Sequence, residues 1–231
     1  MEHNKEFDIE EIRNVEKQRW VEDRNKFNLI YPAEEVIRLI KRSCKNPKNS
    51  VILDFGCGSG RNIRPMIDMK FKKIIAVDYN EECLQLAKNN LQKYESISYI
   101  QNTRLQIPME DNSVDCIVAW GALFGFTKEE RINFTKEIYR VLKPGGNLIA
   151  DYRGIEDNLY GKGEQIEQNL YLLDDRAGSL GKTVYWFCDD KDLKQLYESN
   201  GFKITTIERK VQYVNNLSDI VDHYYIVAQK N

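Results

Sequence analysis

Three glycines stand at alternate positions, Gly56, Gly58 and Gly60, directly after the largely apolar residues 51–55. The apolar run is typical of a buried parallel strand, and the glycines leave almost no side-chain bulk in the loop that follows. Backbone N–H groups in such a loop can approach a ligand closely, and the next helix directs the positive end of its dipole to the same place. We therefore predict that this loop binds a cofactor.

A carboxylate follows about twenty residues later, where the apolar residues 74–77 end at Asp78. In a Rossmann-type unit, an acidic residue at this distance binds the ribose hydroxyls, and the ring of Tyr79 can lie against adenine. The alternative is that Asp78 only caps the helix that begins at Asn80. A dinucleotide fingerprint places its third glycine three positions after the second. In this chain the third glycine, Gly60, comes two positions after Gly58, so the spacing argues against a dinucleotide.

These features resemble motif I and the following acidic position of the class I S-adenosylmethionine (SAM) methyltransferases. Residues 99–115 resemble the adenine loop and the turn after it in that family, and residues 141–146 resemble its Leu-Lys-Pro-Gly-Gly turn. The resemblance extends over residues 51–151. It implies SAM as cofactor, S-adenosylhomocysteine (SAH) as product, and cofactor-binding residues Asp54, Phe55, Gly56, Cys57, Gly58, Gly60, Asn62, Asp78, Tyr79, Thr103, Arg104, Ala119 and Trp120.

The adenine loop departs from the family at one position. Many relatives carry an Asp that accepts the adenine amino group where this chain has Thr103. A threonine hydroxyl still accepts one hydrogen bond, and the Arg104 backbone N–H can serve adenine N1, but the assistance of a charge is lost.

The resemblance implies an α/β fold with a seven-stranded, mostly parallel Rossmann-like sheet, a C-terminal antiparallel hairpin and helices on both faces. The local patterns agree with it. Thr127 and Glu130 form a capping-box pattern that begins a helix, and residues 203–214 and 224–229 alternate as paired strands do.

We expect one domain over residues 1–231, with an N-terminal helical cap over residues 1–45. Residues 152–188 have no clear periodicity, five glycines and many aromatic side chains, and they are too long for an ordinary connection. We predict that this insertion includes a strand or two and covers the substrate site. The N-terminal segment with Trp20, Arg24 and Tyr31 is expected to close over the same site.

Composition predicts a cytoplasmic protein without a membrane segment. No stretch approaches the roughly 20 apolar residues of a membrane span, and the N-terminus is charged. Lys plus Arg number 34 against 36 Asp plus Glu, so we expect no nucleic-acid partner because no general basic field exists. Five scattered cysteines without C-x-x-C spacing and only two histidines predict no metal site.

The methyl acceptor is inferred by elimination. Residues 119–122, Ala-Trp-Gly-Ala, stand where base-amino methyltransferases resemble one another in an Asn-Pro-Pro-Tyr-like element. The Pro-Cys nucleophile of cytosine C5 enzymes and the paired glutamates of arginine methyltransferases are also missing there. We therefore expect a small-molecule acceptor methylated at oxygen or nitrogen. Two alternatives stay open: an RNA- or protein-modifying SAM methyltransferase, and a SAM-fold protein without methyl transfer, either a pure binder or a NAD-type oxidoreductase.

Candidate catalytic residues follow the fifth strand. Asp151 and Tyr152 are possible general bases, and Arg153 could hold an anionic substrate. The alternative roles are a turn carboxylate for Asp151 and packing for Tyr152.

Overall fold

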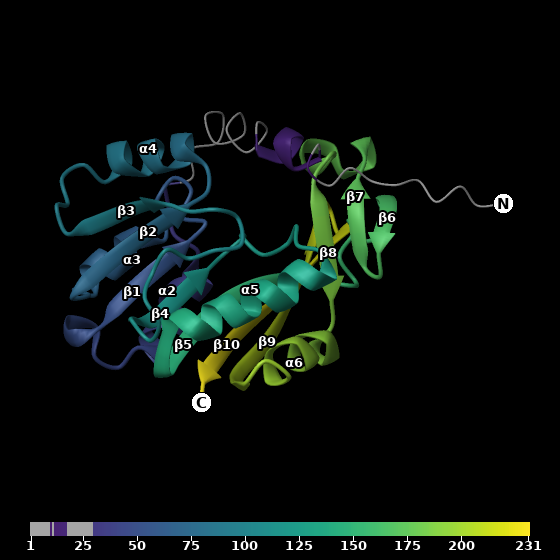
Figure 1. The fold of residues 1–231 in the computed structure, drawn as a ribbon. Helices are drawn as coiled ribbons and strands as arrows, with labels where there is room; N and C mark the ends of the chain where they lie inside the picture. The colour runs from purple at the N-terminus through teal and green to yellow at the C-terminus, as the bar shows by residue number, and fades with distance from the viewer. Residues whose placement is uncertain (1–9, 11, 18–29) are drawn as a thin grey trace.

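A mixed sheet of ten strands runs through the protein, which is described by a computed structural model for residues 10, 12–17 and 30–231 (Figure 1). Its first five strands are parallel and lie in the order β3-β2-β1-β4-β5. They are β1 (Val51–Phe55), β2 (Lys73–Asp78), β3 (Ile97–Gln101), β4 (Val114–Ala119) and β5 (Leu142–Gly154). Two further strands, β10 (Asp219–Lys230) and β9 (Phe202–Val214), add an antiparallel hairpin beside β5. These seven strands are the predicted Rossmann-like sheet.

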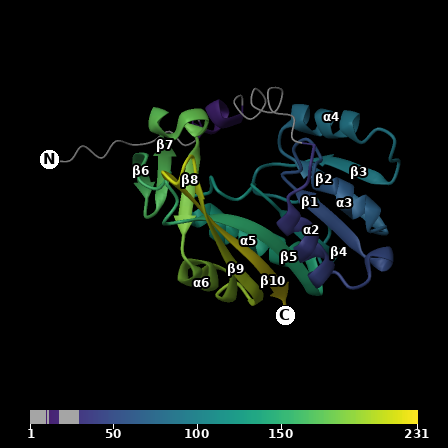
Figure 2. The same cartoon turned by 180° about the vertical axis from the view of Figure 1, so that it is seen from behind.

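Helices cover both faces of this sheet because its strands are apolar on both sides. The core on one face includes side chains from α2 (Glu34–Ser43), α3 (Ile63–Asp68) and α4 (Glu81–Asn90). The core on the other face includes side chains from α5 (Lys128–Val141) and α6 (Asp190–Glu198). The α5 helix accordingly lies in front of β10 in Figure 1 and behind it in Figure 2. The described residues also include two short 3-10 helices, η1 (Pro47–Asn49) and η2 (Asp175–Leu180).

Side-chain caps begin three of the helices. The Asn80 carboxamide accepts a hydrogen bond from the Glu82 N–H at the start of α4. The predicted capping box is present at α5, where Thr127 and Glu130 each bind the other's backbone N–H. Asp189 and Asp192 form a second capping box at α6. These caps satisfy backbone donors that the first helical turn leaves unpaired, and they fix where each helix begins.

The insertion forms three strands, one more than the sequence predicted. We call this part, β6 (Gly163–Glu167), β7 (Leu170–Leu173) and β8 (Val184–Cys188), the arm. Its strands are antiparallel to one another, and β8 joins the main sheet beside the last two residues of β5. Both views show the arm at one end of the molecule and α4 at the other (Figures 1 and 2). The arm is held by its own buried cluster, which includes Leu173, Tyr185 and Phe187 and extends to Phe124 in the main domain.

The junction between β5 and the arm leaves no space for a side chain at Gly154. A Cβ atom there would lie 1.8 Å from Oδ2 of Asp222, which is completely buried and accepts two hydrogen bonds from Arg209. We expect Gly154→Ala to lower the free energy of unfolding by about 3 kcal/mol. Gly145→Ala is the control because nothing lies within 4 Å of its Cβ, and its positive φ of 76° costs only about 1 kcal/mol. Urea unfolding of both variants measures the difference, and equal losses would contradict this account of the junction.

Candidate functional site

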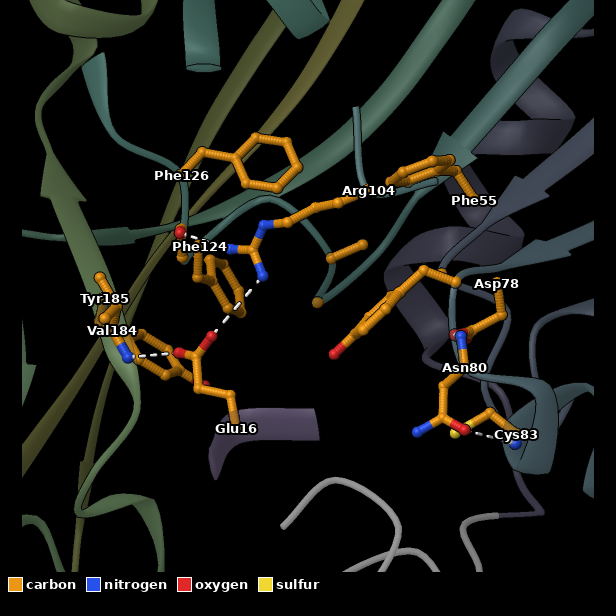
Figure 3. A pocket seen from close by; sticks show the side chains of 15 residues that line it. Glu16, Phe55, Asp78, Asn80, Cys83, Arg104, Phe124, Phe126, Val184 and Tyr185 are labelled. Carbon is orange, nitrogen blue, oxygen red and sulfur yellow. Dashed lines mark hydrogen bonds and ion pairs between the residues drawn. The ribbon is translucent and has the colours of Figure 1, made fainter. Parts of the chain in front are cut away.

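A pocket lies at the carboxyl ends of β1, β2 and β4 and reaches to β8 of the arm (Figure 3). At one end it is lined by Phe55 and Gly56 from the glycine loop and by Asp78 and Tyr79 from the end of β2. At the other end it is lined by side chains from the loop after β4 and from the arm. The pocket occupies the edge where open α/β sheets bind their ligands.

The glycine loop has a backbone that other residues adopt with difficulty. Gly56, Gly58 and Gly60 have φ angles of 67°, 54° and 81°, all in the left-handed region. A Cβ atom on Gly56 would also lie 2.7 Å from the Cβ of Ala122 across the pocket. The Cys57 N–H donates to the Val77 carbonyl oxygen at 3.0 Å, which ties the loop to β2. The glycines are therefore required both by conformation and by close approach.

The Asp78 carboxylate is buried and oriented by two backbone donors. Its Oδ2 accepts a hydrogen bond from the Gly58 N–H at 2.9 Å, and its Oδ1 accepts one from the Asn80 N–H at 2.9 Å. The next side chain, Tyr79, lines the same pocket, and burial raises the pKa of its hydroxyl to about 12. The Asp78 carboxylate thus accepts hydrogen bonds, whereas the neutral tyrosine ring offers an apolar face.

Glu16 and Arg104 meet across the mouth of the pocket (Figure 3). Nη1 of Arg104 lies 3.6 Å from Oε2 of Glu16, and its Nη2 donates to the Gly125 carbonyl oxygen at 2.6 Å. Oε1 of Glu16 accepts a hydrogen bond from the Val184 N–H of β8 at 2.6 Å. Burial raises the pKa of Glu16, and the neighbouring Arg104 guanidinium opposes this. Glu16 therefore connects the helical residues 12–17 with the arm.

Comparison with known proteins finds a methyltransferase domain and a methyltransferase fold. A methyltransferase domain model matches residues 52–146. A solved SAM-dependent methyltransferase from Methanosarcina mazei superposes with a TM-score of 0.70 over 83% of this chain and 96% of that one, at 22% identity, and therefore has the same fold.

Residues 52–146 thus match a methyltransferase domain, and the chain has the fold of a SAM-dependent methyltransferase. The curated O-methyltransferase 3 of Dictyostelium discoideum is 25% identical over 96% of this chain. The chain spans about half the length of that relative, 48%. A tRNA N(3)-methylcytidine methyltransferase of Schizosaccharomyces pombe is 28% identical over 74% of this chain and 57% of its own length.

The tRNA methyltransferases contradict one expectation from the sequence, that of a small-molecule acceptor without a nucleic-acid partner. That expectation depended on a net charge of −2 and on motifs missing after the fourth strand. Net charge describes the field of the whole surface, whereas binding of a nucleic acid depends on local contacts along one groove. The expectation failed because composition contains no information on where charges lie.

The cofactor is SAM, and the pocket fits it. The glycine loop has no room for a side chain at Gly56, as expected where a ligand and two backbone segments come close together. The Asp78 carboxylate lines the pocket and is oriented by the Gly58 and Asn80 N–H groups, and carboxylate oxygens are the acceptors that ribose hydroxyls need. Of the residues implied by resemblance, the pocket is lined by Phe55, Gly56, Asp78, Tyr79 and Arg104.

The other implied cofactor residues do not line the pocket. Asp54, Cys57 and Ala119 are buried, and Asn62 accepts a hydrogen bond from the Ala33 N–H. Gly58 contributes its N–H to Asp78. Their contacts with SAM stay predictions.

Three further members of that set have distinct surroundings. A Cβ on Gly60 would lie 2.8 Å from Cδ1 of Leu91, so this glycine permits close packing of α4. Thr103 is exposed, and the ring of Trp120 stacks on Tyr225 with centroids 5.2 Å apart. Contacts of these residues with SAM also stay predictions.

The two candidate bases lie on opposite faces of β5. Tyr152 is buried in the core, where its hydroxyl contacts that of Tyr197 and burial raises its pKa well above the usual value. We therefore assign Tyr152 to packing. Asp151 lies on the other face, and its Oδ1 accepts a hydrogen bond at 2.6 Å from the N–H of Gly121, which lines the pocket.

The candidate substrate residues are more scattered. Arg153 forms an ion pair with the buried Asp157 at 2.6 Å, so its guanidinium is already engaged. Tyr31 is 79% exposed, and Trp20 and Arg24 lie outside the described residues.

The structure adds aromatic residues that the sequence analysis did not select. Phe124 and Phe126 come from the loop after β4, and Tyr185 comes from β8. The sequence pattern of Phe124 and Phe126 beside Gly121 and Gly125 could have predicted that this loop faces a ligand. Glu16 had no such signal, because it is one of many charged residues in its segment.

Two general features of the described residues can be added. In this part of the chain, no group of three or more His, Cys, Asp or Glu side chains is arranged to hold a metal ion. No helix there combines the length and the apolar character needed to cross a bilayer.

We expect Asp78→Ala to weaken binding of SAH roughly 10- to 150-fold, about 1.5–3 kcal/mol, because it removes a charged acceptor for two hydroxyls. Titration calorimetry measures this loss. Asp68→Ala is the control because Asp68 is an exposed acidic residue at the end of α3. Unchanged affinity in the Asp78 variant would remove this residue from the cofactor site.

A second prediction concerns the contact between Glu16 and the arm. Glu16→Ala leaves the Val184 N–H without its acceptor, so we expect hydrogen exchange at Val184 to accelerate about 10-fold. Asn14→Ala, an exposed change in the same segment, should leave this amide unaffected. Equal exchange in the two variants would show that Glu16 does not hold the arm.

Proposed function

We propose that this protein transfers the methyl group of SAM to a ring nitrogen of cytidine in RNA. The observation that carries the proposal is the aromatic end of the pocket, formed by Phe124, Phe126 and Tyr185. The rings of Phe124 and Tyr185 are nearly parallel, at 25°, with centroids 5.1 Å apart. Enzymes that modify a base take it out of the stack and hold it against such side chains. A flat ring is thus the acceptor that this end of the pocket suits best.

The polar groups beside the aromatic end support a nucleobase. The Glu16 carboxylate can accept a hydrogen bond from an amino group, and the Arg104 guanidinium can donate to a carbonyl oxygen. A cytosine ring has both groups on its edges. The pair can therefore distinguish such a ring from a plain aromatic hydrocarbon.

The relatives support RNA as the molecule that carries this ring. Besides the Schizosaccharomyces pombe protein, they include a tRNA N(3)-cytidine methyltransferase of Danio rerio, 26% identical over 70% of this chain. An Asn-Pro-Pro-Tyr-like element, which binds a planar amino group, is missing after β4. Its absence favours a ring nitrogen over the exocyclic amino group as the methylated atom.

In the proposed reaction, the protein positions the acceptor against the methyl group and encloses both. SAM supplies the methyl group on a sulfonium sulfur, which needs no covalent enzyme intermediate. We propose that residues 12–17 and the insertion 152–188 together cover the acceptor, as the contact from Glu16 to Val184 suggests. Holding the acceptor in line with the methyl group and excluding water provide most of the rate enhancement in such a displacement.

A labelling experiment tests the acceptor. The protein is incubated with tritiated-methyl SAM and, separately, with unmodified tRNA transcripts, total RNA and a small-metabolite extract. We expect label in the RNA, and 3-methylcytidine after digestion to nucleosides and mass spectrometry. The Asp78→Ala variant is the control for cofactor-dependent labelling. Label confined to the metabolite extract would overturn the proposal.

A further inference from the structure

His223 lies at the same sheet edge as the pocket, although it comes from near the end of the chain. It is in the first half of β10, opposite Arg153 of β5. Because β10 runs antiparallel to β5, its first residues lie where the parallel strands end. The side chain of His223 keeps 20% of its surface exposed. A residue that is distant in sequence is thus brought to the carboxyl edge of the sheet.

A carboxylate faces one nitrogen of this imidazole. Oδ2 of Asp151 lies 3.7 Å from Nδ1 of His223. The other oxygen of Asp151 is held by the Gly121 N–H at 2.6 Å, and the carboxylate is buried. A carboxylate on the Nδ1 side favours the tautomer with hydrogen on Nδ1 and leaves Nε2 as an acceptor.

The imidazole also adjoins the aromatic end of the pocket. The ring of Phe124, which lines the pocket, meets it edge-on at a centroid distance of 6.5 Å. On its other side the ring of Tyr225 lies 6.1 Å away. His223 therefore contacts the part of the molecule that we assign to the acceptor.

We propose that Nε2 of His223 accepts a hydrogen bond from the amino group of the acceptor base, with Asp151 as the positioning residue. This inference rests on the proposed function. When the ring nitrogen bonds to the methyl carbon, the C–S bond breaks and its electron pair passes to sulfur. One positive charge moves to the ring, and no proton has to leave. A neutral imidazole that accepts a hydrogen bond from the charged ring system stabilises it, whereas a protonated imidazole repels it.

Asp151 is the carboxylate that the structure places against the imidazole, at 3.7 Å. Arg153 and Lys210 lie directly opposite His223 on the two neighbouring strands, and Tyr225 lies two positions along β10, opposite Glu208. Glu208 forms an ion pair with Arg38 at 2.5 Å. Arg153 is paired with Asp157 at 2.6 Å, and Lys210 with Glu35 at 2.7 Å. Burial raises the pKa of Tyr225, which is therefore neutral.

The first test uses NMR of the imidazole groups, with the His223 signals assigned by the variant H223N. SAM and SAH differ by the methyl group and by one positive charge. We expect the imidazole chemical shifts of His223 to differ between the SAM complex and the SAH complex at the same pH, because the sulfonium charge lies nearby. Identical His223 shifts in both complexes would overturn the placement of His223 at the methyl-transferring end, whatever the acceptor is.

The second test uses the RNA acceptor found by labelling. We expect H223A to lower kcat about 100-fold with unchanged SAH affinity, and D151N to lower it less. In the wild type, kcat/KM should fall at acidic pH as the imidazole protonates, and H223Q should lose this acidic fall. An unchanged kcat in H223A, or an acidic fall that persists in H223Q, would overturn the proposal. If no RNA is labelled, the proposed function fails, whereas the NMR comparison still decides where His223 lies.

Discussion

The hydrogen bond from the Gly58 N–H to the Asp78 carboxylate joins the two loops on which the cofactor site depends. It connects the glycine loop after β1 with the end of β2, and the Cys57 N–H adds a second bond to the β2 backbone. Parallel strands end at one edge, so both loops arrive at the same place without any long connection. The conformation of the glycine loop and the orientation of the Asp78 carboxylate therefore depend on each other. Changes in either loop are expected to affect both.

The aromatic end of the pocket, to which we assign the methyl acceptor, is assembled differently from the glycine loop and the end of β2. Its side chains come from four separate parts of the chain: the segment 12–17, the loops after β3 and β4, and the arm. No single hydrogen-bonded motif organises it. The aromatic cluster around Phe124 and Tyr185 and the contacts of Glu16 hold it together. An end built from packing between distant segments can change its acceptor by exchange of side chains while the cofactor loops stay the same.

Buried carboxylates are a common feature of both ends. Asp78 and Asp151 each bind a backbone N–H of a pocket-lining or glycine loop, and Glu16 binds one of the arm. Such bonds compensate the cost of burying a charge. The overall charge of −2 does not show this arrangement, and for the same reason it did not predict the kind of acceptor that the relatives indicate.

The sequence alone predicted the fold class, the capping box at Thr127, and a glycine loop and a carboxylate that the structure places beside one pocket. These features depend on residues close together in the chain: alternating glycines, a carboxylate at the end of the next strand, and a capping box. Only the tertiary structure decided the roles of Tyr152 and Asp151, which are neighbours in sequence but point to opposite faces of β5. Glu16, Tyr185 and His223 likewise join the site through contacts between residues that lie about 60 to 170 positions apart in the chain. Local patterns encode local geometry, whereas such contacts depend on how the whole sheet pairs and packs.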